Sequence, residues 1–494
     1  MARRKEPGRE VTSTTEACPK IPKPPTGSPN KPSATRSPKW TQTQIIAIGL
    51  TTLTLLSAVT ITNWWALYIP VQSDIILSST TIGGDGEDSI AEVITTKAGE
   101  LIFVGSTSSW GLGGNISETD IWLGQIDQNG NLLWNRTLGT TCDEAGVSII
   151  ECSDGGFAIA ASIHSWKNDS MDHYYYDGDV LLVRTDAEGT LLWNTTFGGP
   201  KPDWTERIVE CSDGGLAIVG STVNWAAGMF DILLIRFDAN GNYLWNQTYG
   251  GEDFDHAWDI VRTESGFLIA GSSESFSSYT TVFNTTNPDG YLVCTDEEGN
   301  LLWNRTYGAW SDDGFYCIIP QPNNGYLITG YSAELQPTKA AMYAYPWLVR
   351  IDAVGNILWE KILRSSGHIA IGCSDGGFAL AGSHTITEWW IHYDLSFVRL
   401  DNAGNVLWQW IHGYEELGDA VGTALQLEDT SFLLIAYSDT CWGDVWMLRI
   451  SDIRTNQIRV SQSLIPILVA VMIIIIGVVI VLVWQYRRRR VLQS

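Results

Sequence analysis

A unit of nine residues recurs six times along this chain, and it constrains the fold more than any other feature. The first copy reads NLLWNRTLG at 131–139 and the last reads NVLWQWIHG at 405–413. Their tryptophans follow one another, by subtraction, at intervals of 49 to 59 residues: Trp134, Trp193, Trp245, Trp303, Trp359 and Trp408. A period of roughly 40–60 residues with several strands in each unit is typical of a β-propeller.

Each unit is predicted to form four strands, named a to d in chain order, with the Trp motif as strand d. Strand b follows a glycine turn, as in DGGLAIVGS at 213–221, and strand c ends in a D-x-x-G turn, as in DILLIRFDANG at 231–241. The glycine of that second turn can adopt the positive φ that a tight hairpin requires. The strand b pattern occurs seven times, which predicts seven blades.

The seventh unit has no Trp motif of its own after strand c. The segment DIILSSTTIGG at 74–84 matches the strand d pattern instead. We therefore predict an all-β fold, a seven-bladed β-propeller closed by an N-terminal strand. Such closure removes the open sheet edges that would otherwise favour aggregation.

The repeats resemble the PQQ-like propeller family of quinoprotein dehydrogenases. IDAVGNILW at 351–359 and FDANGNYLW at 237–245 look like the strand, turn and docking tryptophan of that family. The resemblance covers most of the repeat region, but only as a blade pattern. That family usually has eight blades and a Thr before the turn Gly, neither of which is found here, and no adjacent cysteine pair is present. The resemblance therefore implies the fold and not the quinone cofactor. The repeats are also similar to tandem propeller repeats in uncharacterised microbial membrane-anchored surface proteins.

Two apolar stretches, 44–69 and 464–484, flank the repeats. About 20 apolar residues cross a bilayer as a helix, so each is predicted to be a transmembrane helix. The tail at 1–43 is basic and rich in Pro and Ser, which predicts disorder, and the tail at 485–494 holds four arginines. The positive-inside rule places both termini in the cytoplasm and the propeller at 70–460 outside the cell. A cleaved signal peptide is the alternative reading of the first stretch.

The charge is strongly asymmetric along the chain. The formal net charge is −25, and the two tails together carry +10, which leaves about −35 for the part between them. Such a surface disfavours nucleic acid and anionic lipid, and it attracts cations or basic partners. N-glycosylation of an exported chain is predicted at seven N-x-S/T sequons: Asn115, Asn135, Asn168, Asn194, Asn246, Asn284 and Asn304.

Aspartates recur four residues after a glycine, at the predicted start of strand a near the mouth of the central channel. They are Asp88, Asp143, Asp203, Asp255 and Asp312, with Asp419 as a looser match. A ring of carboxylates is one way to bind Ca²⁺, which takes 6–8 oxygen ligands. The alternative is a set of turn caps that accept backbone N–H groups. We predict no cofactor, with Ca²⁺ as the possible metal.

Aromatic residues are frequent in the predicted loops between strands b and c. Trp110, Trp166, Trp225, Phe276 and Trp442 share one register, which favours packing between blades. The aromatic residues outside that register are candidates for binding a protein or a glycan: Tyr174, Tyr175, Tyr176, Tyr343, Tyr345, Trp389 and Trp390. The alternative is that they cover the top of the domain as packing.

No catalytic motif is found. The chain has neither HExxH nor G-x-S-x-G, and no cysteine spacing indicates zinc. Cys152, Cys211 and Cys373 share one repeat slot and are predicted to be small buried residues. The sequence therefore favours a membrane-anchored binding or scaffolding propeller. The alternatives are an extracytoplasmic enzyme, either a glycan hydrolase or a quinoprotein-like oxidoreductase, and a structural component of the cell envelope.

Overall fold

The computed structural model describes residues 75–111, 119–140, 142–168, 174–277, 287–308, 312–321, 325–333, 345–363, 367, 369–385, 393–412, 419–438 and 445–452. All of these residues belong to one compact unit, Ile69–Ser494. Both predicted transmembrane helices and both predicted tails lie outside the described residues. Within those ranges, no helix combines the length and the apolar composition needed to cross a bilayer.

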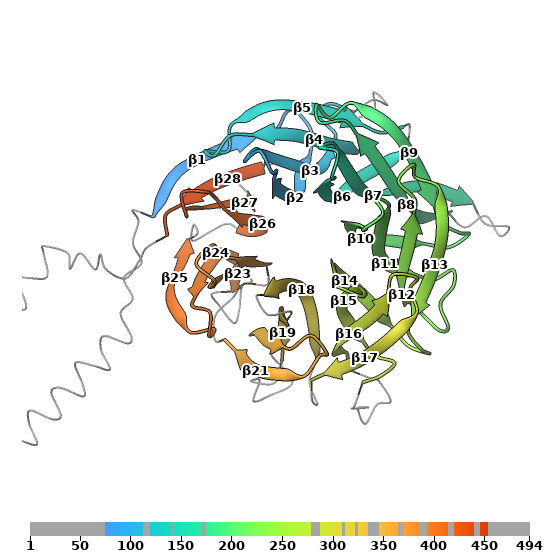
Figure 1. Ribbon diagram of the computed structural model, residues 1–494. Helices are drawn as coiled ribbons and strands as arrows, with labels where there is room; N and C mark the ends of the chain where they lie inside the picture. The colour runs from blue at the N-terminus through green and yellow to red at the C-terminus, as the bar shows by residue number, and fades with distance from the viewer. Residues whose placement is uncertain are drawn as a thin grey trace, which may run out of the picture. The chain divides into compact units, whose positions relative to one another are not determined.

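The described residues form twenty-eight strands in seven four-stranded antiparallel sheets, arranged as blades around a ring (Figure 1). This confirms the predicted all-β, seven-bladed propeller.

The bounds of the strands follow the repeats. Blade 1 comprises β2 (Asp88–Thr95), β3 (Leu101–Thr107), β4 (Asp120–Ile126) and β5 (Leu132–Leu138), and blade 2 comprises β6 (Asp143–Glu151), β7 (Phe157–Asn168), β8 (Tyr174–Thr185) and β9 (Leu191–Phe197). Blade 3 comprises β10 (Asp203–Glu210), β11 (Leu216–Thr222), β12 (Asp231–Phe237) and β13 (Tyr243–Tyr249), and blade 4 comprises β14 (Asp255–Arg262), β15 (Gly266–Ser273), β16 (Asp289–Asp296) and β17 (Leu301–Tyr307). Blade 5 comprises β18 (Asp313–Gln321), β19 (Gly325–Ser332), β20 (Tyr345–Ile351) and β21 (Ile357–Ile362). Blade 6 comprises β22 (Ile369–Gly372), β23 (Phe378–Thr385), β24 (Tyr393–Leu400) and β25 (Val406–His412). Blade 7 comprises β26 (Asp419–Gln426), β27 (Phe432–Ser438), β28 (Val445–Ile450) and β1 (Ile76–Ile82).

The ring is closed by the first described strand of the chain. β1 is the outermost strand of blade 7, and it pairs antiparallel with β28 through partners such as Thr80 and Met447. The Trp446 side chain also donates a hydrogen bond from Nε1 to Ser79 Oγ, at 2.9 Å. The predicted closure by an N-terminal strand is therefore confirmed.

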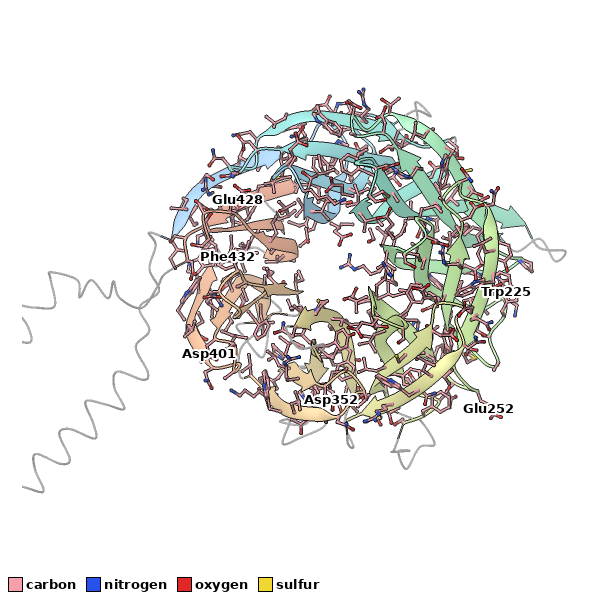
Figure 2. The ribbon with its side chains drawn as sticks, viewed as in Figure 1. Trp225, Glu252, Asp352, Asp401, Glu428 and Phe432 are labelled. Atoms are coloured by element: carbon pink, nitrogen blue, oxygen red, sulfur yellow. The ribbon has the colours of Figure 1, made fainter. Side chains whose placement is uncertain are left out.

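The core lies between blades, because strands b and c are covered on both faces. Every residue of β11 and β12 is buried, which is why these strands read as continuous apolar runs rather than as an alternation. The described residues contain seven hydrophobic clusters, each drawn from two neighbouring blades. Phe432 lies in one of them, whereas the turn residues Asp352 and Asp401 lie near the circumference (Figure 2).

The repeated tryptophans join each blade to the next. A Cβ atom added to Gly189, in the c–d turn of blade 2, would lie 3.0 Å from the Trp134 ring of blade 1. The same relation holds for Gly355 with Trp303, at 2.9 Å. These turn glycines have φ near +80°, at 76° and 83°. Glycine is therefore required both by the backbone conformation and by the ring that packs against it.

Candidate functional site

The inner strands of the ring carry a β-bulge at one shared position in six blades. In β10, for example, the pairing with strand b shifts between Thr205 and Arg207. The extra residues are Ala91, Val147, Glu206, Trp258, Tyr316 and Gly422. Bulges re-aim side chains and are frequent beside active sites. Four charged residues lie at these bulges or directly after them, and they form the first candidate site. We name this site the channel cluster: Glu92, Glu206, Arg207 and Asp259.

Arg207 is the centre of the channel cluster. Its Nη1 lies 3.0 Å from Glu92 Oε1, and its Nε lies 3.7 Å from Asp259 Oδ1. Glu92 belongs to blade 1 and Arg207 to blade 3, so this ion pair passes across the inner side of blade 2. Each carboxylate also accepts a backbone N–H from the following blade, Glu92 from Ile149 at 2.8 Å and Asp259 from Ile318 at 2.7 Å.

The protonation of the channel cluster is shifted by burial. Burial raises the pKa of Glu206 to about 7, and the neighbouring Arg207 opposes that rise. Burial likewise raises the pKa of Asp259 to about 6, against the effects of Arg207 and of the Ile318 N–H. Glu92 and Asp259 are the strongest influences that keep Arg207 charged: Glu92 raises its pKa most, and burial opposes it.

The channel cluster has only part of what carboxyl-based hydrolysis needs. Glu206 can exchange a proton near neutral pH, but a glycosidase also needs a second carboxyl group that faces the substrate. Glu92 and Asp259 are each held by Arg207 and by a backbone N–H. These bonds connect blades 1 to 5 on their inner side, so the cluster acts mainly to hold the ring together.

Three of the predicted calcium ligands, Asp88, Asp203 and Asp255, begin inner strands and accept backbone N–H groups from the loop before the strand. Asp88 accepts from Gly84 N, Thr107 Oγ1 and Ser109 Oγ at 2.5 to 2.8 Å. Asp203 and Asp255 accept the corresponding N–H groups of Gly199 and Gly251. This pattern favours turn caps. Among the described residues no group of three His, Cys, Asp or Glu side chains is placed to hold a metal.

In blades 2 and 5, the residue equivalent to Asp88, Asp203 and Asp255 is the one that follows the predicted aspartate. We call this position the slot. Glu144, not Asp143, accepts the Thr140 N–H in blade 2 at 3.2 Å, and β18 begins at Asp313, not Asp312. Blades 1, 3 and 4 have two glycines before the slot. Blades 2 and 5 have one glycine there, so a count of four residues from that glycine reaches the residue before the capping carboxylate. Asp419 begins β26 opposite Ser438, in the same register.

At several junctions between blades, the inner carboxylate lies near a second carboxylate at the start of strand c of the preceding blade. A Cβ added to Gly250 would collide with Asp231 Oδ1 and lie 2.7 Å from Asp255 Oδ2. Both aspartates are buried, and burial raises the pKa of each. In the described part of the chain, neither Oδ1 atom has a hydrogen-bond partner. Asp120 with Glu144 repeats the arrangement at the junction of blades 1 and 2, where burial is again the main cause of the raised pKa of Glu144.

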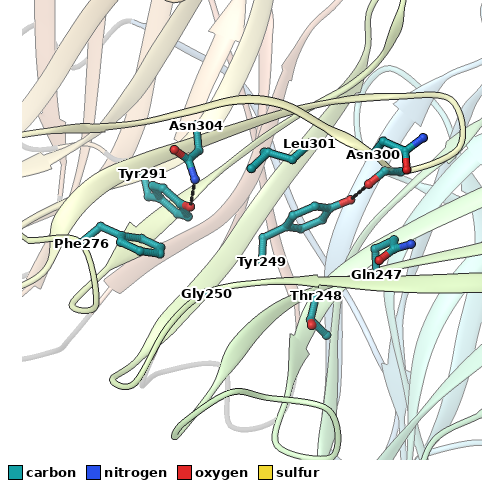
Figure 3. A pocket seen from close by; sticks show the side chains of 10 residues that line it. Gln247, Thr248, Tyr249, Gly250, Phe276, Tyr291, Asn300, Leu301 and Asn304 are labelled. Carbon is teal, nitrogen blue, oxygen red and sulfur yellow. Dashed lines mark hydrogen bonds between the residues drawn. The ribbon is translucent and has the colours of Figure 1, made fainter.

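The second candidate site is a groove of about 420 Å³ on the outer side of the ring, between blades 3 and 4 (Figure 3). We name it the blade 3–4 groove. Phe276, Tyr291 and Tyr249 supply aromatic rings, and the centroids of Phe276 and Tyr291 are 5.4 Å apart. The remaining lining residues are uncharged: Gln247, Thr248, Gly250, Gly299, Asn300, Leu301 and Asn304. Aromatic walls with a few amide groups are typical of sites that bind neutral polar ligands.

Hydrogen bonds fix the rings of the groove and leave other polar atoms available. Tyr249 Oη donates to Gly299 O at 2.6 Å, and Asn304 Nδ2 donates to Tyr291 Oη at 2.9 Å. Burial raises the pKa of Tyr291, so its hydroxyl stays protonated. Within the described ranges the Gln247 side chain and Asn304 Oδ1 make no hydrogen bond. The groove therefore presents fixed rings and free amides to a ligand.

The aromatic residues that share a register are packed and yet partly exposed. Trp110 stacks on Trp122 at 5.2 Å, Trp225 on Phe197 at 5.0 Å and Phe276 on Tyr291. Each remains 37–43% exposed. In blade 4 this exposed ring is one wall of the groove, a role that its shared register had not indicated.

The predicted off-register aromatics are only partly described. Tyr174, Tyr175 and Tyr176 open β8 and pair, in the backbone register, with residues 168, 167 and 166 of β7. β7 and β8 have 12 residues each, more than the b and c strands of the other blades. Tyr345 is half-buried at the start of β20. Tyr343, Trp389 and Trp390 lie outside the described residues.

The sequons fall mainly on the outermost strands. Asn135, Asn194, Asn246 and Asn304 lie on β5, β9, β13 and β17, directly after the docking tryptophans, and Asn168 ends β7. Asn194 and Asn304 are exposed. Asn115 and Asn284 lie outside the described ranges. Asn304 lines the blade 3–4 groove, so a glycan attached to its Nδ2 would lie beside the proposed ligand site. Cys152, Cys211 and Cys373 are buried, as predicted.

The fold and these sites define a seven-bladed β-propeller, and comparison with known proteins adds little beyond that. No family model matches the sequence. The regulatory protein FlaEY of Caulobacter vibrioides is 28% identical over 187 residues, which are 34% of this chain and 20% of that protein. The chain thus spans about a fifth of that relative's length.

The similar solved structures have low sequence identity to this chain. The Pan2 WD40 domain of Neurospora crassa has a TM-score of 0.44 and 8% identity, covering 74% of this chain and 90% of that one. A PL25 ulvan lyase has a TM-score of 0.46 and 8% identity, covering 75% and 96%. The NanB sialidase of Streptococcus pneumoniae has a TM-score of 0.38 and 11% identity, covering 78% and 71%. These similarities are too distant to indicate an activity.

Proposed function

We propose that this chain is a membrane-anchored propeller that binds a glycan on the outer side of the cell, through the blade 3–4 groove. The groove carries the proposal, because it offers aromatic rings, the Gln247 amide and Asn304 Oδ1, and no charged residue in its lining. Sugars are recognised by stacking on such rings and by hydrogen bonds to amides. Its volume of about 420 Å³ lies within the usual range for ligand sites, roughly 300–1,000 Å³.

The anchoring rests on the sequence. The apolar stretches 44–69 and 464–484 and the basic tails beyond them support two membrane spans with both termini in the cytoplasm. The engagement of Glu92 and Asp259 by Arg207 counts against a two-carboxylate hydrolase in the channel. A binding role for the propeller is therefore favoured over the enzymatic alternatives.

A glycan array with the purified full-length chain tests this function. Phe276→Ala removes an exposed wall of the groove and should weaken binding at least about fivefold, since truncated aromatic anchors typically lose over 1 kcal/mol. Gln247→Ala should weaken binding without altering the fold, because its side chain is exposed.

Trp110→Ala is the matched control. Trp110 occupies the slot of Phe276 in blade 1, with a similar exposure and a similar ring partner. Its loss should leave glycan binding unchanged. Absence of any retained glycan, or an equal loss in the Phe276 and Trp110 variants, would contradict the proposal.

A further inference from the structure

Strand d begins with a β-bulge in all seven blades, and the extra residue is always leucine. In blade 1, for example, Gln125 pairs with Trp134 and Ile126 with Leu132, so Leu133 is left out of the register. The seven residues are Leu77, Leu133, Leu192, Leu244, Leu302, Leu358 and Leu407. Each is 42–59% exposed. We name these residues, with the residue before each, the leucine belt.

The leucine belt gathers most of the exposed apolar surface of the described residues. Among the described residues eighteen large apolar side chains are exposed, and twelve of them belong to the leucine belt. Besides the seven leucines these are Leu191, Tyr243, Leu301, Ile357 and Val406. Apolar residues scattered singly over a surface need no explanation, whereas these side chains recur at one register in all seven blades.

Packing between blades does not require these leucines. The tryptophan that follows each one makes the contact with the next blade, as Trp134 does with Gly189. The bulge turns the leucine out of the ladder, so a polar residue could occupy the position without loss to the core. The recurrence of leucine there is thus unexplained by the stability of a single propeller.

The ends of the described chain lie at the same height as the belt. Leu77 is the second residue of β1, and Ile76 pairs with Ile450 at the end of β28. Residues 70–75 and 453–463 connect these ends to the predicted spans, and extended chains of that length reach about 20 and 40 Å. Copies anchored in one membrane would therefore keep their belts within those distances of the bilayer. This step rests on the anchoring proposed above.

Charge favours a neighbouring protein over lipid as the occupant of the belt. The c–d turns that precede the belt carry ionised aspartates: the pKa values of Asp238 and Asp296 are lowered chiefly by hydrogen bonds from the Asn242 and Asn300 side chains. These turns would have to enter the lipid headgroups before the belt did. On the strands themselves, Arg305 and Lys361 bond the turn of the following blade, which offsets the acidic charge beside the belt.

The size of each contact is small. Only the belt residues of one or two blades can face a given neighbour, whereas a stable interface uses roughly 20–30 residues a side. Two free copies in solution would therefore associate weakly. Anchoring raises the effective concentration and removes orientational freedom, so weak contacts on several sides add together. We propose that the leucine belt is the lateral contact surface between copies of this chain in the plane of a membrane.

Energy transfer between donor- and acceptor-labelled full-length chains, reconstituted together in phosphatidylcholine vesicles, tests this proposal. The wild type should show more transfer than randomly distributed copies at the same density, and it should be monomeric in dilute detergent. Replacing all seven bulge leucines by glutamine should abolish the excess transfer. Leu133→Gln, Leu192→Gln and Leu358→Gln together should reduce it.

The matched control replaces three exposed apolar residues away from the belt, with Trp110→Gln, Trp225→Gln and Met229→Gln, and should keep the excess. Thermal melting checks that each variant is folded. If the sevenfold variant does not fold, the energy transfer of the triple variant tests the proposal instead. Random transfer by a wild-type chain that floats with the vesicles overturns the belt proposal alone. A chain that does not float overturns the anchoring, and the belt proposal with it. Flotation that is lost only in the belt variants would make lipid the occupant and would also overturn the proposal.

Discussion

Glu206 occupies the bulge of β10, beside an arginine that its neighbours Glu92 and Asp259 already neutralise. Within the part of the chain that the structure describes, its partly buried carboxyl makes no ion pair, and burial raises its pKa to about 7 against the opposing effect of Arg207. Asp231, Asp255 and Glu144 are raised by burial in the same direction. The folded protein therefore holds protons that the unfolded chain releases at lower pH.

The stability of the propeller should fall as the pH rises from about 4.5 to 7. The folded pKa of Glu206 is above its unfolded value, so its stabilising contribution is complete below that unfolded value and is lost as the pH passes through the folded one. Glu206→Gln mimics the protonated form. At pH 8 it should raise the free energy of unfolding by roughly 1–3 kcal/mol, and at pH 4 it should change it little. Denaturant titrations at both pH values measure the difference.

Glu298→Gln, which alters an exposed glutamate in the c–d turn of blade 4, is the control for that experiment. It should have no effect at either pH. An equal gain in the two variants would mean that net charge, and not burial of Glu206, sets the pH dependence.

Trp134→Ala should lower stability by roughly 2–4 kcal/mol, because it opens a cavity between blades 1 and 2. The ring packs on Gly189, and its Nε1 donates to Gln125 Oε1 at 2.5 Å. Trp110→Ala in the same blade removes a more exposed ring and should cost less. Thermal melts of the two variants compare them directly, and equal losses would argue against the docking role.

At the scale of the strands, the repeat was sufficient to predict the blades and the closing strand. Patterns such as L-W-N-x-T and D-G-G are local, and each specifies a strand or a turn by itself. The blade 3–4 groove and the channel cluster could not be predicted this way. Arg207 and Glu92 are far apart in the sequence, and only the ring geometry brings blades 1 and 3 into contact. A charged Glu-Arg pair in an inner strand, where Val147 and Ser148 stand in blade 2, was the available signal.

Deleting residues 70–84 should destabilise the domain or cause it to aggregate. The segment includes β1, whose loss leaves β28 as an open edge and removes Ile75 and Ile82 from the core. Thermal melting and size-exclusion chromatography of the truncated chain measure the effect. Deleting residues 1–40, which removes only the predicted tail, should leave the melting temperature unchanged. Similar melting of both truncated forms would contradict the closure.

At the scale of the whole molecule, the proposed anchoring puts both termini on one side of the membrane and the propeller on the other. Tags at both termini should resist protease added to intact cells, because the basic tails are expected in the cytoplasm. The propeller between them should be accessible, for example to an antibody against the β7–β8 hairpin. Digestion of either tag would exclude two spans with both ends inside.

Because β1 pairs with β28, the ring cannot close until the last blade has been synthesised. Ser79 and its partner Trp446 are 367 residues apart, so at roughly 5–20 residues per second the first strand waits some 20–70 s for the last. During that interval the emerging blades form an arc that ends in an unpaired edge. Every molecule thus passes, on the ribosome, through a state in which β1 has no partner, whereas the deletion of β1 would leave the other member of that pair, β28, permanently exposed.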